Sequence, residues 1–311
     1  MKNTYNISRF ENKDVHLYAP IYSSAFSANP DMDAVRNKFF HPYQNTNPSF
    51  IAISENSQPA SFYGVILQHA QYNQTVFTIA QSCDSMTHKD HSGQGLFVKV
   101  AEATYSFLKK EGINYVYGFP NKAIYDLRKI KLNWEYRENI HVFKQKIKTL
   151  PFDKLVKKIP LLKKTYIGYL NLLFKKYKSP QTHFSNSVLK ENIAAVIHND
   201  AYFGYKSGTD KFILKINGIN FWVKVDGNMW IGDFENASVE NFSVAFKQLK
   251  KIAGKAGISN IVFHYQEGTL NDSLLRQMME IHSTMPLGFR NLTDEHKNKI
   301  FKFSGSDFDT W

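Results

Sequence analysis

The chain has 311 residues, of which 43% are hydrophobic and 15% aromatic, so it is long and apolar enough for two globular domains and is not a disordered segment. Its single cysteine, Cys83, excludes an intramolecular disulfide framework. The first 14 residues contain no apolar signal core, and no run of about 18 apolar residues follows, so we expect a cytoplasmic protein.

The formal net charge of +12 is concentrated in one segment. Between Lys144 and Lys178 the chain holds eleven lysines and one acid, Asp153, so this segment carries +10 and the remainder is nearly balanced. A protein that binds nucleic acid through a uniformly basic surface has a different distribution. We therefore expect no specific nucleic acid partner.

The first half of the chain alternates between strand and helix patterns. Apolar or alternating runs of strand length predict strands at 50–54, 60–69, 76–82, 113–119 and 135–147. Apolar residues at helical spacing predict helices at 18–26, at 96–108 and from Asn121 onward, and residues 41–48 form a polar, aromatic loop. This order predicts an α/β domain with a mixed sheet.

A glycine turn, Gly93-Gln94-Gly95, lies between the strand at 76–82 and the helix that begins at Leu96. Backbone N–H groups at such a turn point outward, and the helix dipole favours an anion there. The spacing does not fit the P-loop, and the third glycine of a Rossmann loop would fall on Val98. Glycines also occur at helix starts simply to make the turn, so the pattern alone leaves both roles open.

The run Thr87-His88-Lys89-Asp90-His91-Ser92-Gly93-Gln94-Gly95-Leu96-Phe97 resembles the acetyl-CoA pyrophosphate loop of the GNAT N-acetyltransferases. Gly118-Phe119-Pro120-Asn121, Tyr125 and Lys131-Leu132-Asn133-Trp134 resemble the segment that follows that loop in the family. The resemblance covers roughly residues 5–148. This sequence departs from the family pattern at Ser92, usually Arg or Gln, at Phe97, usually small, and at Asn133, often glycine.

The resemblance implies acetyl-CoA as a cosubstrate. Because Ser92 removes a side-chain partner for phosphate, we expect the backbone from Gln94 to Leu96 to hold it. The implied binding residues are Ser82, Cys83, Ser92, Gly93, Gln94, Gly95, Leu96, Phe97 and Asn121. Asn121 is equally explained as a helix cap. We expect no metal, because no histidine has a second ligand at helical or turn spacing.

Acetyl transfer to an amine requires a polarised carbonyl, a neutral amine and protonation of the departing thiolate. Tyr125 lies where the family often carries the acid, although it is also explained as a packing tyrosine. Asp84 and His88 are the candidate bases, with His91 and then His41 and Tyr43 as weaker ones, and polar loop positions explain the histidines as well. A nucleophilic role for Cys83 is not supported, because Asp84 beside it disfavours the thiolate.

Residues 149–180 predict two basic amphipathic helices broken at Pro160. One interpretation is a connector whose apolar face packs on a lobe and whose lysines are solvated. The other is a weak contact of Lys144–Lys178 with an anionic surface.

The second half repeats the first. Gly112-Ile113 has a counterpart in Gly257-Ile258, and the same offset places Glu240 where Gly95 lies. Around them, a strand at 229–234, a helix at 242–252, a strand at 261–265 and a helix at 270–282 are predicted. A carboxylate at the phosphate position repels the ligand, so the second copy is expected to have lost the cofactor site. Trp222, Trp230, Asp233 and Arg290 are expected in its sheet.

The sequence therefore predicts an α/β (α+β) protein with two GNAT-like lobes, each a mixed twisted sheet flanked by helices. The predicted domains are residues 1–148, a connector at 149–180, and a degenerate lobe at 181–311. The predicted activity is transfer of an acetyl group from acetyl-CoA to a small or saccharide-linked amine. The alternatives are a Fem-type ligase that takes its acyl group from a charged tRNA, and a non-catalytic module that binds acyl-CoA.

Overall fold

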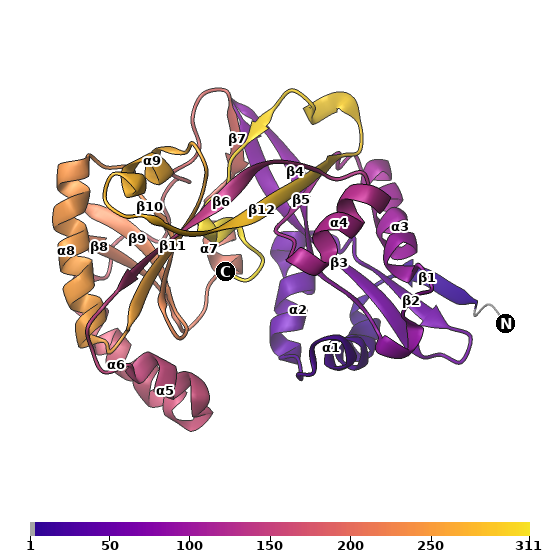
Figure 1. The fold of residues 1–311 in the computed structure, drawn as a ribbon, viewed down its shortest axis with the longest axis horizontal. Coiled ribbons are helices and arrows are strands. Elements are labelled where there is room, and N and C mark those ends of the chain that lie inside the picture. The colour runs from indigo at the N-terminus through magenta and orange to yellow at the C-terminus, as the bar shows by residue number, and fades with distance from the viewer. Residues whose placement is uncertain (1–3) are drawn as a thin grey trace. The chain divides into compact units, whose positions relative to one another are not determined.

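The computed structural model describes residues 4–311, apart from the side chains of Lys122, Ala123 and Pro160. The chain packs as two compact units (Figure 1). Unit 1 comprises the described residues up to Ala70, then Val76–Arg137 and Pro286–Lys299. Unit 2 comprises Gln71–Thr75, Glu138–Met285 and Ile300–Trp311. The assignment of a second GNAT-like domain to residues 181–311 stays a prediction.

Unit 1 is built on a mixed sheet. Its strands, in spatial order, are β1 (Tyr5–Arg9), β2 (Phe50–Ser54), β3 (Pro59–Tyr72), β4 (Thr75–Thr87), β5 (Tyr115–Gly118) and part of β12 (Ile281–Asn291). β2 pairs antiparallel with both β1 and β3, whereas β4 and β5 are parallel. The parallel pair requires the crossover helix that the sequence predicts between them.

Helices cover both faces of this sheet. Along β3, Phe62 and Ile66 pack with α1 (Tyr18–Phe26) and α2 (Met32–Phe40), while Tyr63, Val65 and Leu67 pack with α3 (Leu96–Lys110). This alternation is the period of two that places successive strand residues on opposite faces. Short 3-10 turns occur at Asn12–Leu17, Pro42–Gln44 and Lys89–His91, and α4 (Lys122–Lys131) follows β5.

The helix α2 was not predicted. Its N-cap, Asp31, accepts hydrogen bonds from the backbone N–H groups of Asp33 and Ala34 at 3.0 and 3.1 Å. Val35 and Phe39, four residues apart, form its buried face. With only two buried residues on one face, the helix has a weak apolar period, and the Asp31 cap was its clearest sequence signal.

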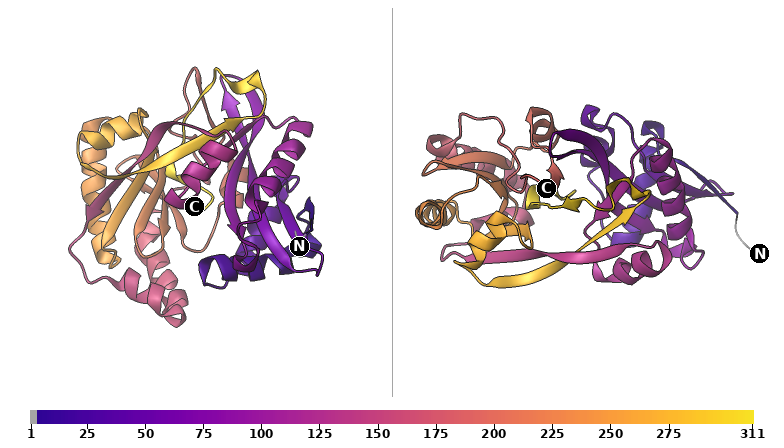
Figure 2. Two further views of the ribbon diagram at one scale, coloured as in Figure 1. Left: turned by 45° about the vertical axis from the view of Figure 1, so that its right-hand side comes forward. Right: turned by 90° about the horizontal axis from the view of Figure 1, so that it is seen from above.

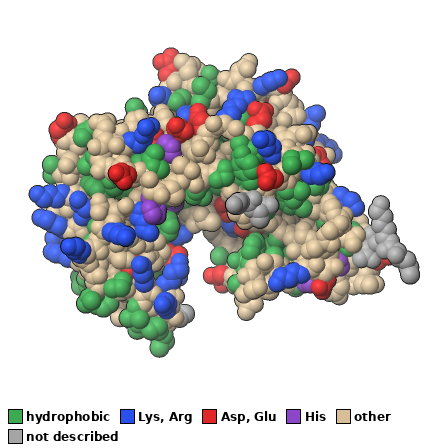
Figure 3. Space-filling view, viewed as in Figure 1, with side chains coloured by type: hydrophobic (Ala, Val, Ile, Leu, Met, Phe, Trp, Pro, Cys, Tyr) green, Lys and Arg blue, Asp and Glu red, His purple; other side chains and the backbone are tan. Residues whose placement is uncertain are grey.

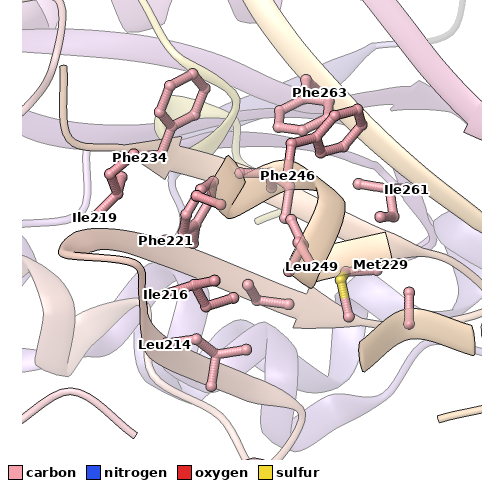
Figure 4. Packing of buried hydrophobic residues seen from close by; sticks show 14 of the residues in the cluster. Leu214, Ile216, Ile219, Phe221, Met229, Phe234, Phe246, Leu249, Ile261 and Phe263 are labelled. Carbon is pink, nitrogen blue, oxygen red and sulfur yellow. The ribbon is translucent and has the colours of Figure 1, made fainter. Parts of the chain in front are cut away.

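Unit 2 contains a further set of mixed strands and a large hydrophobic core. Its strand order is β6 (Glu135–Lys146), β11 (Asn260–Gln266), β10 (Met229–Phe234), β9 (Ile219–Val225) and β8 (Lys211–Ile216), with β10 and β11 parallel. The short strands β7 (Ile193–Val196) and β13 (Ile300–Phe301) pair in parallel. The helices are α5 (Phe152–Lys158), α6 (Lys163–Phe174), α7 (Asp200–Tyr205), α8 (Val239–Lys255) and α9 (Leu270–Arg276). Figure 4 shows Phe246 and Leu249 of α8 packed over Phe221, Met229 and Phe263.

β6 and β12 each contribute residues to both units. Figure 2 shows the two long strands side by side from two directions, and within unit 1 a Cβ on Gly288 of β12 would lie 2.6 Å from the Tyr136 ring of β6. The helix predicted at 270–282 is therefore too long, because α9 ends at Arg276 and β12 begins at Ile281. Arg290, predicted in the second lobe, lies in unit 1 and pairs with Glu102 at 2.8 Å.

The basic connector packs on unit 2. Leu170 and Phe174 of α6 enter the core, and the Tyr166 and Tyr169 hydroxyls donate hydrogen bonds to the carbonyls of Ala256 and Lys255. A 3-10 turn, Pro160–Leu162, separates α5 from α6. None of the helices in the described part of the chain is long and apolar enough to cross a bilayer.

Candidate active site

The strands β4 and β5 separate at their carboxyl ends. Their parallel register joins Ala80 to Val116 and Gln81 to Tyr117, after which β5 ends at Gly118 while β4 continues to Thr87. Within that continuation Asp84 has a φ of 41°, which interrupts the extended conformation of the strand. A non-glycine residue in this region is uncommon and redirects the backbone and side chains beside it. Crevices at the carboxyl ends of parallel strands are common ligand sites.

The glycine turn predicted between the strand and helix is formed by Gly93 and Gly95, with φ angles of 75° and 69°. Side chains rarely adopt this left-handed conformation, which explains the glycines. A Cβ placed on either residue would meet nothing within 4 Å. The loop therefore presents its backbone to open space, and the glycines are required by conformation rather than by crowding.

The N-terminus of α3 is uncapped. Gly95 is its N-cap and offers no side chain to the first N–H groups, and the first turn contains no acidic residue. The first N–H groups of any α-helix have no partner inside the helix, and they carry the positive end of its dipole. A helix end of this kind is a suitable binding site for an anion.

The side chains of the loop divide into anchors and exposed groups. Leu96 is buried in the core on the α3 face of the sheet, and Phe97 packs edge-on against Tyr63. Ser92 is exposed, with its hydroxyl 3.4 Å from the carbonyl oxygen of His88, and Gln94 is also exposed. Phe97, where the family usually has a small residue, thus supports the loop from beneath.

Gly118, at the end of β5, lies where three elements meet. A Cβ there would lie 2.9 Å from the carbonyl oxygen of Ser82 on β4 and 3.1 Å from a guanidinium nitrogen of Arg128 on α4. The buried Ser82 accepts a hydrogen bond of 2.8 Å from the Arg128 guanidinium. Glycine is the residue that allows Arg128 to reach β4.

Arg128 is a buried cation that was not predicted from the sequence. Its side chain is only 3% exposed, its guanidinium stacks 4.5 Å from the Trp134 ring, and its second hydroxyl partner is Ser85 at 3.4 Å. Among the described residues it has no acidic partner, and its Nε makes no hydrogen bond. The available sequence signal was its position midway between Ile124 and Leu132 on an apolar face of i, i+4 spacing.

A buried charge without an opposite charge is costly, and it attracts any anion that can approach it. The surroundings hold Arg128 in place, because the Trp134 indole donates to the Tyr105 hydroxyl at 2.9 Å and Tyr105 is bonded to Tyr63 at 2.6 Å. Burial raises the pKa of Tyr105 well above its usual value, so this hydroxyl stays neutral beside the guanidinium. Arg128 is therefore a fixed positive charge at the point where β4 and β5 separate.

Tyr125 lies one turn before Arg128 on α4. Its ring lies 4.0 Å from that of Tyr136, whose hydroxyl is 3.4 Å from the Tyr125 carbonyl oxygen. Burial raises the pKa of Tyr136 to about 12, so Tyr136 remains a hydrogen-bond donor at neutral pH. The Tyr125 ring is half-buried. Its role as the acid stays a prediction.

The candidate bases make local contacts. Asp84 accepts a hydrogen bond of 3.0 Å from Tyr18 and forms an ion pair of 2.9 Å with Lys38, which ties β4 to α1 and α2. The Nδ1 atom of His88 accepts from the Asp90 N–H at 3.3 Å and so caps the Lys89–His91 turn. His91 is hydrogen-bonded to Tyr5 at 3.1 Å. These contacts give each residue a structural role, and none of them tests catalysis.

The remaining predicted residues lie nearby or serve as caps. The Asn121 side chain accepts a hydrogen bond from the Ile124 N–H at 3.2 Å, so it caps α4. Cys83 is buried beside Ser82 and packs with the α1–α2 face. Asn133 has a φ of 50°, which explains why the related position is often glycine. No group of three or more potential metal ligands occurs in residues 4–311 as described, and the prediction of no metal stays untested.

Comparison with known proteins identifies what this region is similar to. Residues 6–135 match a family model described as an acetyltransferase (GNAT) domain. No curated protein matches the sequence. A GCN5-related N-acetyltransferase from Kribbella flavida is similar in structure, with a TM-score of 0.59 and 9% identity over 93% of this chain and 71% of that chain. Another from Anabaena variabilis has a TM-score of 0.56 and 11% identity over 93% of this chain and 73% of that chain. At these identities the likeness establishes the fold.

Proposed function

We propose that this protein, whose residues 6–135 belong to the GNAT acetyltransferase family, transfers an acetyl group from acetyl-CoA directly to an amine. The observation that carries the proposal is the uncapped start of α3 behind the open Gly93–Gly95 turn. The mixed α/β fold with helices on the sheet faces, as predicted, is that of GNAT proteins. The acceptor class and the roles of individual residues are part of the proposal.

The loop fits a pyrophosphate. The exposed turn leaves space beside both glycines, and the N–H groups of Gln94, Gly95 and Leu96 are placed at the positive end of the α3 dipole. Ser92 supplies a hydroxyl in place of the longer side chain usual in the family. Backbone N–H groups therefore hold the phosphates, and the affinity depends on the conformation of the two glycines.

The pantetheine arm is proposed to run along the edge of β4 beyond Gln81, where β5 no longer pairs with it. Ser82 and Cys83 lie on this stretch, and Asn121 begins the helix that faces it. Strand edges offer unpaired backbone N–H and C=O groups, which suit the two amides of pantetheine. The thioester then lies near the end of β5 and the start of α4.

In the reaction, the amine nitrogen attacks the thioester carbonyl carbon, a C–N bond forms, and the C–S bond breaks. The sulfur leaves as the CoA thiolate and takes up one proton, while the amine gives up one proton. Negative charge develops first on the carbonyl oxygen and then on the sulfur. A fixed cation or donor near these atoms lowers the barrier more than it strengthens substrate binding.

Tyr125 and Arg128 are the proposed groups for this charge. The Tyr125 hydroxyl is proposed to protonate the sulfur, and the Arg128 guanidinium to stabilise the developing anion from its buried position. The proton of the amine is proposed to leave through water to Asp84 or His88. The acceptor is proposed to be a small amine or an amine on a saccharide.

The test is a direct assay of transfer. The protein is incubated with acetyl-CoA and a panel of amino sugars, polyamines and amino acids, and both CoA release and the mass of the acetylated product are followed. The proposal predicts CoA release that depends on the amine and a product heavier by one acetyl group. Micromolar binding of acetyl-CoA in calorimetry without any product would indicate the non-catalytic module, and absence of binding would contradict the proposal.

A further inference from the structure

The connector carries a cluster of exposed apolar side chains, which we call the connector surface. Its members come from α5, the following 3-10 turn, α6 and the residues before α5: Leu150, Phe152, Leu155, Ile159, Leu161, Leu162, Tyr169 and Leu172. Leu161 is 89% exposed, Leu172 73% and Leu150 70%. Scattered exposed apolar residues need no explanation, but a concentration of them on one short segment indicates a contact site.

Apart from Tyr169, which also contacts α8, these side chains are not the packing face of the helices. α6 already buries Leu170 and Phe174 in the core of unit 2, and Tyr166 and Tyr169 fasten it to the end of α8 by hydrogen bonds. Leu172 lies between the two buried residues in sequence but points elsewhere, since it is largely exposed. The connector is therefore apolar on two sides, and one side remains available.

Lysines accompany the exposed leucines. Lys154, Lys158, Lys163 and Lys164 are exposed on the same helices, and in the part of the chain that the structure describes none of them forms an ion pair. Lys157 is paired with Asp226 at 3.1 Å. Figure 3 shows green hydrophobic side chains at the tip of unit 2 over α5, with blue lysines beside them. The segment 144–178 carries +10 of the formal charge of +12.

We propose that the connector surface docks on a membrane that contains anionic lipids, with its leucines in the acyl boundary and its lysines at the headgroups. Charge complementarity selects an anionic partner. The protruding leucines favour a lipid bilayer over a nucleic acid. A phosphate backbone binds cations, but it offers no apolar environment for an exposed leucine. Amphipathic helices with lysines on the polar side and leucines on the other lie in the membrane interface in this way.

The proposal goes beyond acetyl transfer and does not depend on it. A transferase held at an anionic membrane acts on acceptors that are enriched there, such as an amine on a lipid-linked saccharide. Binding to vesicles is measured without acetyl-CoA, so a failure of the membrane proposal and a failure of the enzymatic proposal are separate results.

The test is co-sedimentation of the full chain with vesicles of phosphatidylcholine alone and of phosphatidylcholine with about 30% phosphatidylglycerol. Binding is expected to the anionic vesicles and to fall steeply with salt, because each lysine near the surface strengthens association by about fivefold at low ionic strength. No sedimentation with anionic vesicles would overturn the proposal.

Two variants separate insertion from charge attraction. Leu161→Ser with Leu172→Ser is expected to weaken vesicle binding by about tenfold, since two leucines leave the acyl boundary. Its control is Ile130→Ser with Val244→Ser, which removes apolar side chains that are 68% and 57% exposed elsewhere and should not change binding. Unchanged binding of the leucine variant would contradict insertion.

The lysine variant replaces Lys154, Lys158, Lys163 and Lys164 with Gln and is expected to abolish the preference for anionic vesicles. Its control replaces Lys109, Lys110, Lys129 and Lys131, which are exposed in unit 1, and should keep that preference. An equal loss of the preference for anionic vesicles in both variants would attribute that preference to net charge alone and overturn the proposal. A leucine variant that changes the oligomeric state in ultracentrifugation would instead assign the surface to a second copy of the chain, which also overturns it.

Discussion

Two segments of this chain have the same local fold and different chemistry. In unit 1, β4 leads through the glycine turn into α3 and then to the parallel strand β5. In unit 2, β10 leads into α8 and then to the parallel strand β11. Each helix is followed by a glycine in the left-handed region, Gly112 with a φ of 73° and Gly257 with a φ of 68°.

The two helices differ at their first turn. α3 begins at Gly95, with no capping side chain and no acid in its first turn. α8 begins at Ser238, whose hydroxyl accepts a hydrogen bond from the Asn241 N–H at 3.3 Å, and its first turn contains Glu240. Hydrogen bonds from the backbone N–H of Glu240 and from the Ser238 hydroxyl lower the pKa of the Glu240 carboxyl.

The comparison sets a helix start that we propose as a binding site against one that acts as scaffold. α8 satisfies the N–H group of Asn241 with its own Ser238 cap and places a negative charge at the dipole end, and both features stabilise the helix. α3 has no such cap, which costs stability and leaves its first N–H groups available to the pyrophosphate that we propose binds there. The following predictions are ordered from the largest expected effect to the smallest.

Gly95→Glu places a carboxylate at the start of α3, as Glu240 does in the first turn of α8. We expect acetyl-CoA binding to fall on the order of 100-fold or more, because two like charges about 4 Å apart cost roughly 4 kcal/mol near a protein surface. Calorimetry with acetyl-CoA measures the change.

Gly112→Glu is the matched control, because Gly112 also has a positive φ and open space around its Cβ position. It adds the same charge and a similar backbone strain at the other end of α3. Equal loss of binding in both variants would attribute the effect to stability and remove the evidence for a site at Gly95.

Arg128→Met tests the buried cation of unit 1. We expect kcat to fall on the order of 100-fold, the size seen when one donor to a developing anion is removed. Arg128→Lys keeps the charge and should recover part of the activity. A purely structural role would lower the melting temperature of both variants while the folded fraction keeps its kcat.

Tyr125→Phe removes the proposed acid and leaves the ring contact with Tyr136 in place. We expect kcat to fall roughly tenfold with acetyl-CoA affinity unchanged, a modest effect because a thiolate with a pKa near 8.5 is already a good leaving group. Steady-state kinetics at several pH values check this. Full activity of the variant would assign Tyr125 to packing.

Ser238→Ala tests the other member of the comparison, the capped start of α8. Loss of this cap should lower the free energy of unfolding by about 1 kcal/mol and leave acetyl-CoA binding unchanged. Denaturant titration measures the first quantity and calorimetry the second. A loss of acetyl-CoA affinity in this variant would show that the α8 end takes part in binding.

The sequence predicted the parts of the fold that follow from local patterns. The β4–α3–β5 unit and its glycine turn were predicted because apolar periodicity and left-handed glycines are local properties. The passage of β12 into unit 1 was missed, because strand pairing between Gly288 and Gly118 depends on residues far apart in the chain. Arg128 was missed because its burial against Ser82 depends on the absence of a side chain at Gly118.

The most direct test of the account is hydrogen–deuterium exchange of the full chain with and without saturating acetyl-CoA. The account predicts slower exchange at the amides of residues 93–98, at the start of α3, and no change at the amides of residues 238–241, at the start of α8. Protection at the start of α8, or unchanged exchange at the start of α3 under conditions where calorimetry shows binding, would contradict it.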